Sequence, residues 1–266
     1  MKQNKYKILV LSDLQESTNN TLKSAVSIAK MIQADITFFH AKNATDIVKK
    51  ESQLSAMRTI NKEYSSTKKK ILNFITPISK EYDVTITYDF SFGNVKQEID
   101  QYISKNNPDV IVLGKRKPSS LNITGDNLTG YILKNYNNII FIAENNNSLN
   151  PDEHITLGLL NNNIQSLDKD ITKGLLANTK EPLISFNFIK NRESMNNIQK
   201  NLNEETVNYN FDKNNNTIKN LSNYLLKNNV HLLHINRGEN ENSLTKSDIY
   251  SVINNLKTSL LVTSTN

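Results

Sequence analysis

The feature that most constrains this chain is the regular alternation of short apolar stretches with longer amphipathic ones. The apolar stretches have the length and content of buried β-strands, while the segments between them repeat apolar residues every three or four positions, as helices do. These connections are too long for hairpins, so we expect parallel strands with helices on both faces of the sheet. In the first half the predicted strands are Lys7–Ser12, Asp35–His40, Val84–Phe90, Asp109–Gly114 and Ile139–Ala143.

The same order of elements returns after Asn145–Asp152, a polar stretch with the composition of a linker. A chain of 266 residues is long for one domain and comfortable for two. Two halves with one element order indicate an internal duplication. We therefore expect one domain over residues 1–144 and another over residues 153–266. The second should contain the strands Ile155–Leu160, Leu183–Ile189, Val207–Phe211, Val230–Asn236 and Ser259–Thr263, and a helix over Glu193–Leu202.

The residue types exclude several kinds of chemistry. The chain has no Cys, so it has no disulfides, thiolate metal sites or Cys catalysis. His231 and His234 are three positions apart in a predicted strand, so their side chains should point to opposite faces and share no metal. His40 stands at a strand end beside two Phe residues, which favours a packed or hydrogen-bonded role. Ser12 lacks the context of a nucleophile elbow, so we expect no hydrolase triad.

The net charge of +6 comes entirely from the first half. Residues 1–150 hold 20 Lys and Arg against 14 Asp and Glu, whereas the rest of the chain holds 12 of each. The basic run Lys68–Lys70 has no interleaved aromatic residues, so we expect a solvated helix face and no nucleic acid partner. Neither a signal peptide nor an apolar run of the ~18 residues needed to span a membrane is readable. We expect a cytoplasmic protein with no membrane partner.

One stretch of the first half has the features of an anion-binding site. A predicted strand ends in glycine, a basic loop follows it, and a second glycine precedes a helix-like segment. A loop between a strand and a helix N-terminus can present backbone N–H groups to an anion. In order, the stretch contains Asp109–Gly114, Lys115, Arg116, Lys117, Gly125, Asp126 and Leu128–Asn135.

Five segments of the first half form a recognisable series: Ile8–Asp13, Leu22–Ile32, Ala34–His40, Asp109–Gly114 and Gly125–Ala143. They are a strand with an acidic tip, a helix, a second strand, a further strand, and a glycine loop with the last helix and strand. Taken together they resemble the universal stress protein family, in the form that carries two such domains in one polypeptide. The likeness covers residues 5–144 well and residues 153–266 in outline.

The resemblance implies an α/β fold with two Rossmann-like domains of the adenine nucleotide alpha hydrolase-like type. Each would be a five-stranded parallel sheet with strand order 3-2-1-4-5, which leaves a crevice at the ends of strands 1 and 4. In nucleotide-binding members the acid contacts the nucleoside and the glycine loop wraps the phosphates, which implies ATP or AMP here and no metal site. The implied site residues are Ser12, Asp13, Gly114, Lys115, Arg116, Lys117, Gly125 and Asp126.

The loop departs from the family pattern, which is Gly, two residues, Gly, nine residues, Gly and then Ser or Thr. Lys117 replaces the second glycine, only ten residues separate Gly114 from Gly125, and Asp126 takes the hydroxyl position. The side chain of Lys117 hinders the close approach of the loop backbone to a phosphate. The positive charge of the basic loop would compensate for this by attracting the phosphate. Asp126 either repels the terminal phosphates, so that AMP binds at least as well as ATP, or caps the next helix. The first strand of the second half is followed by Asn161 and no acid, so that domain should not bind nucleotide.

Three functions stay open at this point. The first is a cytoplasmic stress-response or regulatory protein that binds an adenine nucleotide in its first domain and is not an enzyme. The second is a scaffold of the same fold that acts through a protein partner and binds no nucleotide. The third is a weak ATPase, for which no general base or metal pair is readable.

The last predicted strand of each half lies at a sheet edge if the strand order is 3-2-1-4-5. An unpaired apolar edge invites pairing with another strand. Ile139–Ile142 and Ser259–Val262 have this character, and the linker between the halves spans up to about 30 Å when extended. We therefore expect the two strands to pair antiparallel within one chain, as an intramolecular pseudo-dimer of the two domains.

Overall fold

The computed structural model describes residues 4–46, 53–115, 128–161, 168–180, 182–189, 206–212, 214, 216–237 and 246–264. Strands and helices alternate along the chain, as their apolar periodicity predicts. The first half contains β1 (Tyr6–Leu11), α1 (Thr18–Ile32), β2 (Ala34–Lys42), the 3₁₀ turn η1 (Ala44–Asp46), α2 (Gln53–Tyr82), β3 (Ile86–Phe92), α3 (Val95–Asn106), β4 (Val110–Gly114), α4 (Leu128–Asn135) and β5 (Ile139–Ala143).

The second half repeats this order of elements. It contains β6 (Leu157–Leu160), α5 (Lys169–Ala177), β7 (Leu183–Ile189), β8 (Thr206–Asp212), α7 (Thr217–Lys227), β9 (Leu232–Asn236), α8 (Lys246–Asn255) and β10 (Ser259–Thr263). Several boundaries differ from the sequence prediction by one or two residues. The helix predicted over Glu193–Leu202 lies outside the described residues.

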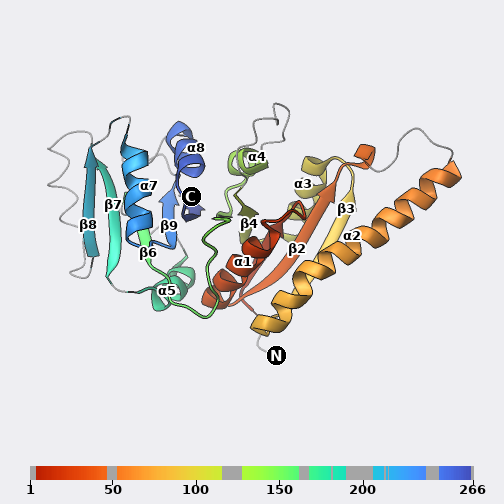
Figure 1. The fold of residues 1–266 in the computed structure, drawn as a ribbon, viewed down its shortest axis with the longest axis horizontal. Helices are drawn as coiled ribbons and strands as arrows, with labels where there is room; N and C mark the ends of the chain where they lie inside the picture. Colours follow the sequence, from red (N-terminus) through yellow and green to blue (C-terminus); the bar gives the residue numbers. More distant parts are fainter. Residues whose placement is uncertain are drawn as a thin grey trace.

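All the described strands join one sheet in the order β3-β2-β1-β4-β5-β10-β9-β6-β7-β8. Figure 1 shows it running through the length of the molecule. The first five strands confirm the order 3-2-1-4-5, and the second half repeats that order in the opposite sense from β10 to β8. Within each half the neighbouring strands are parallel. The α/β fold and the strand order predicted from the sequence are therefore confirmed.

The two halves meet where β5 pairs antiparallel with β10. Phe141 lies opposite Leu261 at the centre of this junction, and both side chains are buried. The antiparallel pairing predicted from the two apolar edges is confirmed. It turns two half-sheets into one continuous mixed sheet and covers both edges at once.

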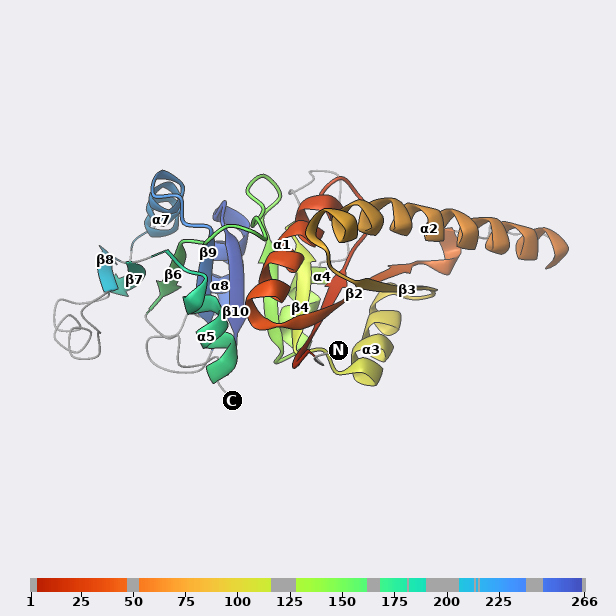
Figure 2. The same ribbon diagram turned by 90° about the horizontal axis from the view of Figure 1, so that it is seen from below.

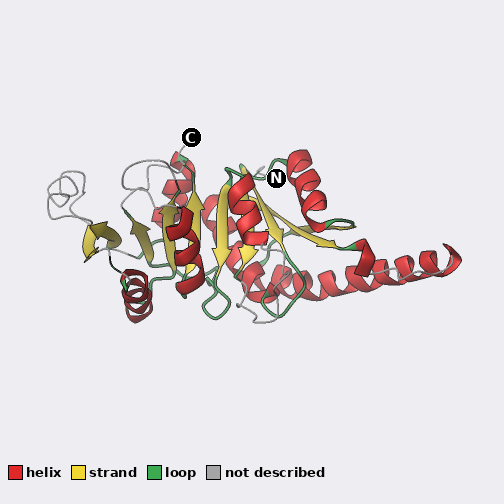
Figure 3. Cartoon of the chain, turned by 90° about the horizontal axis from the view of Figure 1, so that it is seen from above, coloured by secondary structure: helices red, strands yellow, loops and turns green. Residues whose placement is uncertain are grey.

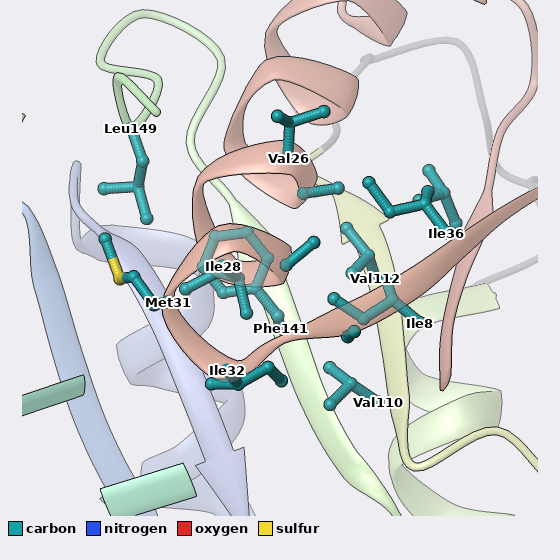
Figure 4. Close-up of a cluster of buried hydrophobic side chains, with 14 of the residues drawn as sticks. Ile8, Val26, Ile28, Met31, Ile32, Ile36, Val110, Val112, Phe141 and Leu149 are labelled. Atoms are coloured by element: carbon teal, nitrogen blue, oxygen red, sulfur yellow. The ribbon is translucent and has the colours of Figure 1, made fainter. Parts of the chain in front are cut away.

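Helices cover both faces of this sheet, and side chains alternate between the faces along each strand (Figures 2 and 3). On β1, Ile8 and Val10 belong to the core beneath α1, whereas Leu9 and Leu11 belong to the core on the α3 side. Figure 4 shows the first core, where side chains from α1 meet those of β1, β2 and β4. Phe141 of β5 joins it, so this core continues to the junction between the halves.

The segment between β5 and β6 has the composition of a linker but is packed along α1. Leu149 is buried in the first core (Figure 4), and its backbone N–H donates to Ser24 Oγ at 3.0 Å. Lys30 of α1 forms an ion pair with Asp152 at 2.9 Å. The connection therefore adds to the contact between the halves.

Helix α2 is the longest element, with 30 residues, and half of it projects beyond the sheet (Figures 1 and 2). Its C-terminal half packs on the first core through Ile71, Ile75 and Ile78. None of the described helices is long and apolar enough to cross a membrane.

Candidate functional site

A cavity of about 310 Å³ opens at the carboxyl ends of β1, β2 and β4. The connections of β1 and β4 leave in opposite directions here, which is where open α/β sheets bind ligands. Its volume is in the range of small-molecule sites. The cavity is lined by Leu11, Ser12, Asp13, Ser17, Thr18, Thr21, Phe39, Ala41, Lys42, Asn43, Val95, Ile99, Leu113, Gly114, Leu128 and Thr129. The structure thus brings together three of the predicted site residues, Ser12, Asp13 and Gly114.

A tight turn places the acidic residue at the mouth of the cavity. Ser12 Oγ accepts the backbone N–H of Leu14 at 3.1 Å, and Asp13 Oδ1 accepts that of Gln15 at 3.2 Å. Leu14 has φ 59°, a left-handed conformation that costs a non-glycine residue about 1–2 kcal/mol. The hydrogen bonds of the turn offset that cost and hold the Asp13 carboxylate at the strand end.

His40 supports this turn from beneath. Its Nδ1 lies 2.8 Å from the carbonyl oxygen of Ser12, an arrangement in which the ring N–H donates to the carbonyl. Burial lowers the pKa of His40, so the neutral ring is favoured. The hydrogen-bonded structural role predicted for His40 is confirmed, and it is a role in positioning the turn that carries Asp13.

Gly114 lies where the end of β4 approaches the first turn of α1. A Cβ at this position would stand 2.5 Å from Thr21 Oγ1 and 3.5 Å from Ser17 Oγ. Gly114 has no positive φ, so its requirement for glycine comes from this contact and not from backbone strain. The close approach allows strand and helix to form one wall of the cavity.

Lys115 lies at the junction between the two halves. Its ammonium lies 3.1 Å from Glu144 Oε2 and also donates to the backbone carbonyl of Leu256 in the second half. The two side chains of the ion pair are only 13% and 9% exposed. Lys115 therefore holds the two halves together in this structure and does not line the cavity.

The other predicted loop residues, Arg116, Lys117, Gly125 and Asp126, lie outside the described residues. Sequence reasoning also missed part of the cavity. The hydroxyl groups of Ser17, Thr18 and Thr21 line it, and none of these residues was among the predicted site residues. Ser17 is the N-cap residue but its side chain makes no capping hydrogen bond. The spacing of hydroxyl residues over one helical turn was the available signal.

The described residues contain no cluster of three or more His, Asp or Glu side chains that could hold a metal ion. His231 precedes β9 instead of lying within it, which corrects its predicted place in the strand. Its Nδ1 accepts the backbone N–H of Thr156 at 2.9 Å. His234 is buried inside β9, with Nε2 3.0 Å from Thr263 Oγ1. Each histidine therefore has its own local partner.

Comparison with known proteins agrees with this geometry. Residues 6–130 match the model of the universal stress protein family. This half of the chain belongs to the universal stress protein family. No curated protein sequence is significantly similar to the chain.

Solved structures extend the likeness of fold to the second half. A universal stress protein from Archaeoglobus fulgidus DSM 4304 is 13% identical, with a TM-score of 0.69 and 98% of each chain covered. A putative universal stress protein from Pseudomonas aeruginosa UCBPP-PA14 is also 13% identical, with a TM-score of 0.56, over 97% of this chain and 93% of that one. At these identities the likeness concerns the fold alone, and it extends over both halves of the chain.

The crevice at the corresponding strand ends of the second half is built differently. The strand pairings make Asn161 equivalent to Ser12 and Asn236 equivalent to Gly114. Asn161 Oδ1 accepts the backbone N–H of Phe188 at 3.0 Å, so this side chain ties the end of β6 to β7. At the equivalent of Gly114 a buried Asn236 side chain is present. The features that open the first crevice are thus absent at these described positions of the second.

Proposed function

We propose that this universal stress protein is a regulatory protein that binds one adenine nucleotide in the cavity of its first half. The observation that carries the proposal is the approach of Asp13 and Gly114 across a cavity of about 310 Å³ at the β1–β4 switch point. An acid and a glycine in this place are what the family's nucleotide site would use. The proposal assigns the bound nucleotide a signalling role and no turnover.

The chemistry of the cavity walls suits an adenine nucleotide. Phe39, Ile99 and Leu113 provide an apolar wall for a flat base. The Asp13 carboxylate is an acceptor for the hydroxyl groups of a ribose. The hydroxyl groups of Ser17 and Thr18 stand at the start of α1, whose first turn has no acidic residue. Such a helix start suits the negative charge of a phosphate.

The proposal is tested by calorimetric titration of the full chain with AMP, ADP and ATP. We expect one nucleotide per chain, and at least a tenfold loss of affinity in Asp13→Asn because a neutral amide is a weaker acceptor for ribose hydroxyls. Asp212→Asn, an exposed acid on β8 of the second half, is the matched control and should bind as the wild type does. Two nucleotides per chain would contradict a single site in the first half.

Two further measurements separate the alternatives. Mass spectrometry of small molecules retained on the purified protein should detect an adenine nucleotide, whereas the scaffold alternative expects none and no heat in the titration. Phosphate release from ATP with Mg²⁺ should stay at the buffer background. Release that depends on Asp13 would replace the regulatory proposal with the ATPase alternative.

A further inference from the structure

The projecting half of α2 carries an exposed apolar stripe made of Leu54, Met57, Ile60 and Tyr64. Their exposed fractions are 73%, 63%, 41% and 53%, which places them among the few large apolar side chains exposed in the described residues. They repeat every three or four positions and therefore lie on one face of the helix. Contiguous exposed apolar residues on a folded protein mark an interaction surface.

The stripe continues the face by which α2 packs on the sheet. Further along the helix, Thr67, Ile71 and Ile75 lie on nearly the same side and are buried. Tyr64 marks the transition, because its ring lies 4.7 Å from that of Phe90 on β3. Beyond this point the helix runs past the sheet edge (Figures 1 and 2), so the same apolar face loses its partner.

The position of the stripe restricts the shape of its occupant. The stripe faces the side of α2 on which the sheet lies, and β3 is the last strand at that end of the sheet. A flat lipid surface laid against it would run into the sheet edge. The occupant must be narrow enough to lie along α2 beside β3, as a helix or an extended strand does.

The edge of β3 does not favour an added strand. The backbone N–H of Phe90 donates to Oδ1 of its neighbour Asp89 at 2.8 Å, so this edge group already has a partner. Side chains that occupy edge groups and charges placed on an edge both oppose strand pairing. Phe90 and Phe92 are half-buried. The ring of Phe90 lies beside that of Tyr64 and 5.7 Å from that of Phe92, so the two Phe residues extend the apolar surface at its inner end. An apolar surface of this form suits the apolar face of a helix.

Charge determines which helix fits. Arg58 and Lys62 are exposed and lie one turn apart along one side of the stripe on α2, and Lys68–Lys70 follow where the helix reaches the sheet. The carboxylate in this stretch, Glu63, is paired with Lys42 at 2.7 Å. A second copy of α2 would bring the same cations against one another, and like charges at a contact oppose association. The complementary partner has acidic flanks.

We propose that the exposed stripe of α2 and the neighbouring Phe90 and Phe92 bind an amphipathic helix with acidic flanks, supplied by another protein. From Leu54 to Tyr64 the stripe covers about 15 Å of helix, which a partner helix of about four turns spans. Met and aromatic side chains are well suited to such a surface because they present large, adaptable contacts. None of the stripe residues lines the cavity of the proposed nucleotide site, so this inference does not depend on nucleotide binding.

The test uses the full chain and a labelled synthetic peptide of 18 residues. The peptide has leucines at i, i+3, i+4 and i+7 and glutamates on both flanks, and a matched peptide has lysines in place of the glutamates. Fluorescence anisotropy should show binding of the glutamate peptide at least tenfold tighter than that of the lysine peptide. Met57→Glu should weaken binding of the glutamate peptide at least tenfold, whereas Leu226→Glu on α7, which is 42% exposed, should not.

Reversing the charge sharpens the test. Arg58→Glu with Lys62→Glu should exchange the preference between the two peptides, and the unfolding midpoint of each variant should stay near that of the wild type because these side chains are exposed. Equal binding of both peptides would overturn the proposal, as would binding that Met57→Glu leaves unchanged. A dimer in sedimentation that Met57→Glu abolishes would assign the surface to a second copy. Met57-dependent sedimentation with anionic phosphatidylserine vesicles would assign it to a membrane.

Discussion

The ends of the fourth strand in the two halves, β4 and β9, are equivalent in the sheet but differ in what they hold. Lys115 follows β4 and Arg237 follows β9. Each backbone N–H donates to the adjacent fifth strand, that of Lys115 to Ala143 at 2.9 Å and that of Arg237 to Thr263 at 2.8 Å. The two cations therefore occupy corresponding places about the pseudo-twofold axis between β5 and β10.

Both cations reach across that axis to the last helix of the other half. Lys115 donates to the carbonyl of Leu256, just after α8. Arg237 donates to the carbonyls of Leu133, Tyr136 and Asn138, at and beyond the end of α4. A cation at a helix C-terminus satisfies carbonyls that lack intrahelical partners and complements the helix dipole. The basic residue after the fourth strand is thus a part of the junction in both halves.

The residue before the cation differs between the two halves, and this changes the space at the end of the fourth strand. Gly114 leaves room for α1 to approach β4, whereas Asn236 fills the corresponding place with a side chain. The cation contact at the junction is therefore present in both halves. The glycine that leaves room at the crevice of the first half is replaced by Asn236 in the second. Through this junction the second half covers the edge of the first, because β10 pairs with β5.

Removal of the ion pair between Lys115 and Glu144 should have the largest effect on the stability of the protein. Lys115→Met leaves the Glu144 carboxylate, whose side chain is 9% exposed, without its counter-charge. Removing one partner of a buried ion pair costs about 3–5 kcal/mol. Urea denaturation should show this loss. Lys115→Met combined with Glu144→Gln should recover most of it, and a double variant no more stable than the single one would mean that the pair contributes little.

The buried polar pair His234 and Thr263 has the apolar counterparts Val112 and Ala143 in the first half. Burial lowers the pKa of His234 from 6.5 to about 4, so the folded protein favours the neutral ring. This contribution to stability is fully present above about pH 6.5 and is lost as the pH falls towards 4, by about 3 kcal/mol in all. His234→Val with Thr263→Ala should reduce the loss of stability between pH 6.5 and 4. An unchanged pH dependence in calorimetry would show that His234 is not its source.

At the open crevice, Gly114→Ala should destabilise the protein by about 2 kcal/mol, because the new Cβ meets Thr21 Oγ1 at 2.5 Å. To relieve this contact α1 must move away from β4, and this movement should weaken nucleotide binding. Thr21→Ala removes the obstructing oxygen, so the double variant Gly114→Ala and Thr21→Ala should regain stability relative to Gly114→Ala alone. Thermal unfolding and nucleotide titration of the three variants measure both effects. Additive losses in the double variant would contradict the contact.

The smallest effect is expected where the cation is kept but its shape is changed. Arg237→Lys retains the charge at the end of α4 but cannot reach all three carbonyls that the guanidinium contacts. We expect a loss of about 1–2 kcal/mol in urea denaturation. The exchange at the equivalent position, Lys115→Arg, introduces a larger group beside Glu144 and should cost less than Lys115→Met. If Arg237→Lys is as stable as the wild type, the positive charge alone accounts for the stabilisation and the shape of the guanidinium does not contribute.

Much of the fold could be predicted because its signals are local. The strands Ile139–Ala143 and Ser259–Thr263 coincide with β5 and β10, since a short apolar run between polar turns is typical of a buried strand. Their antiparallel pairing followed from two apolar edges that had to be covered. The approach of Asp13 and Gly114 followed from the strand order that the family resemblance implied, and the cavity bears out that approach.

Other properties were decided only by the tertiary structure. The basic run after Gly114 resembled a phosphate loop. In the structure Lys115 contacts Glu144 at the end of β5 and the carbonyl of Leu256, which lies across the junction in the other half. The apolar face of α2 extends from Ile75 back to Leu54, but the sheet ends at β3 before the helix does, which exposes Met57. Periodicity along a chain determines which face of an element is apolar. What that face or charge then meets depends on residues far away in the sequence.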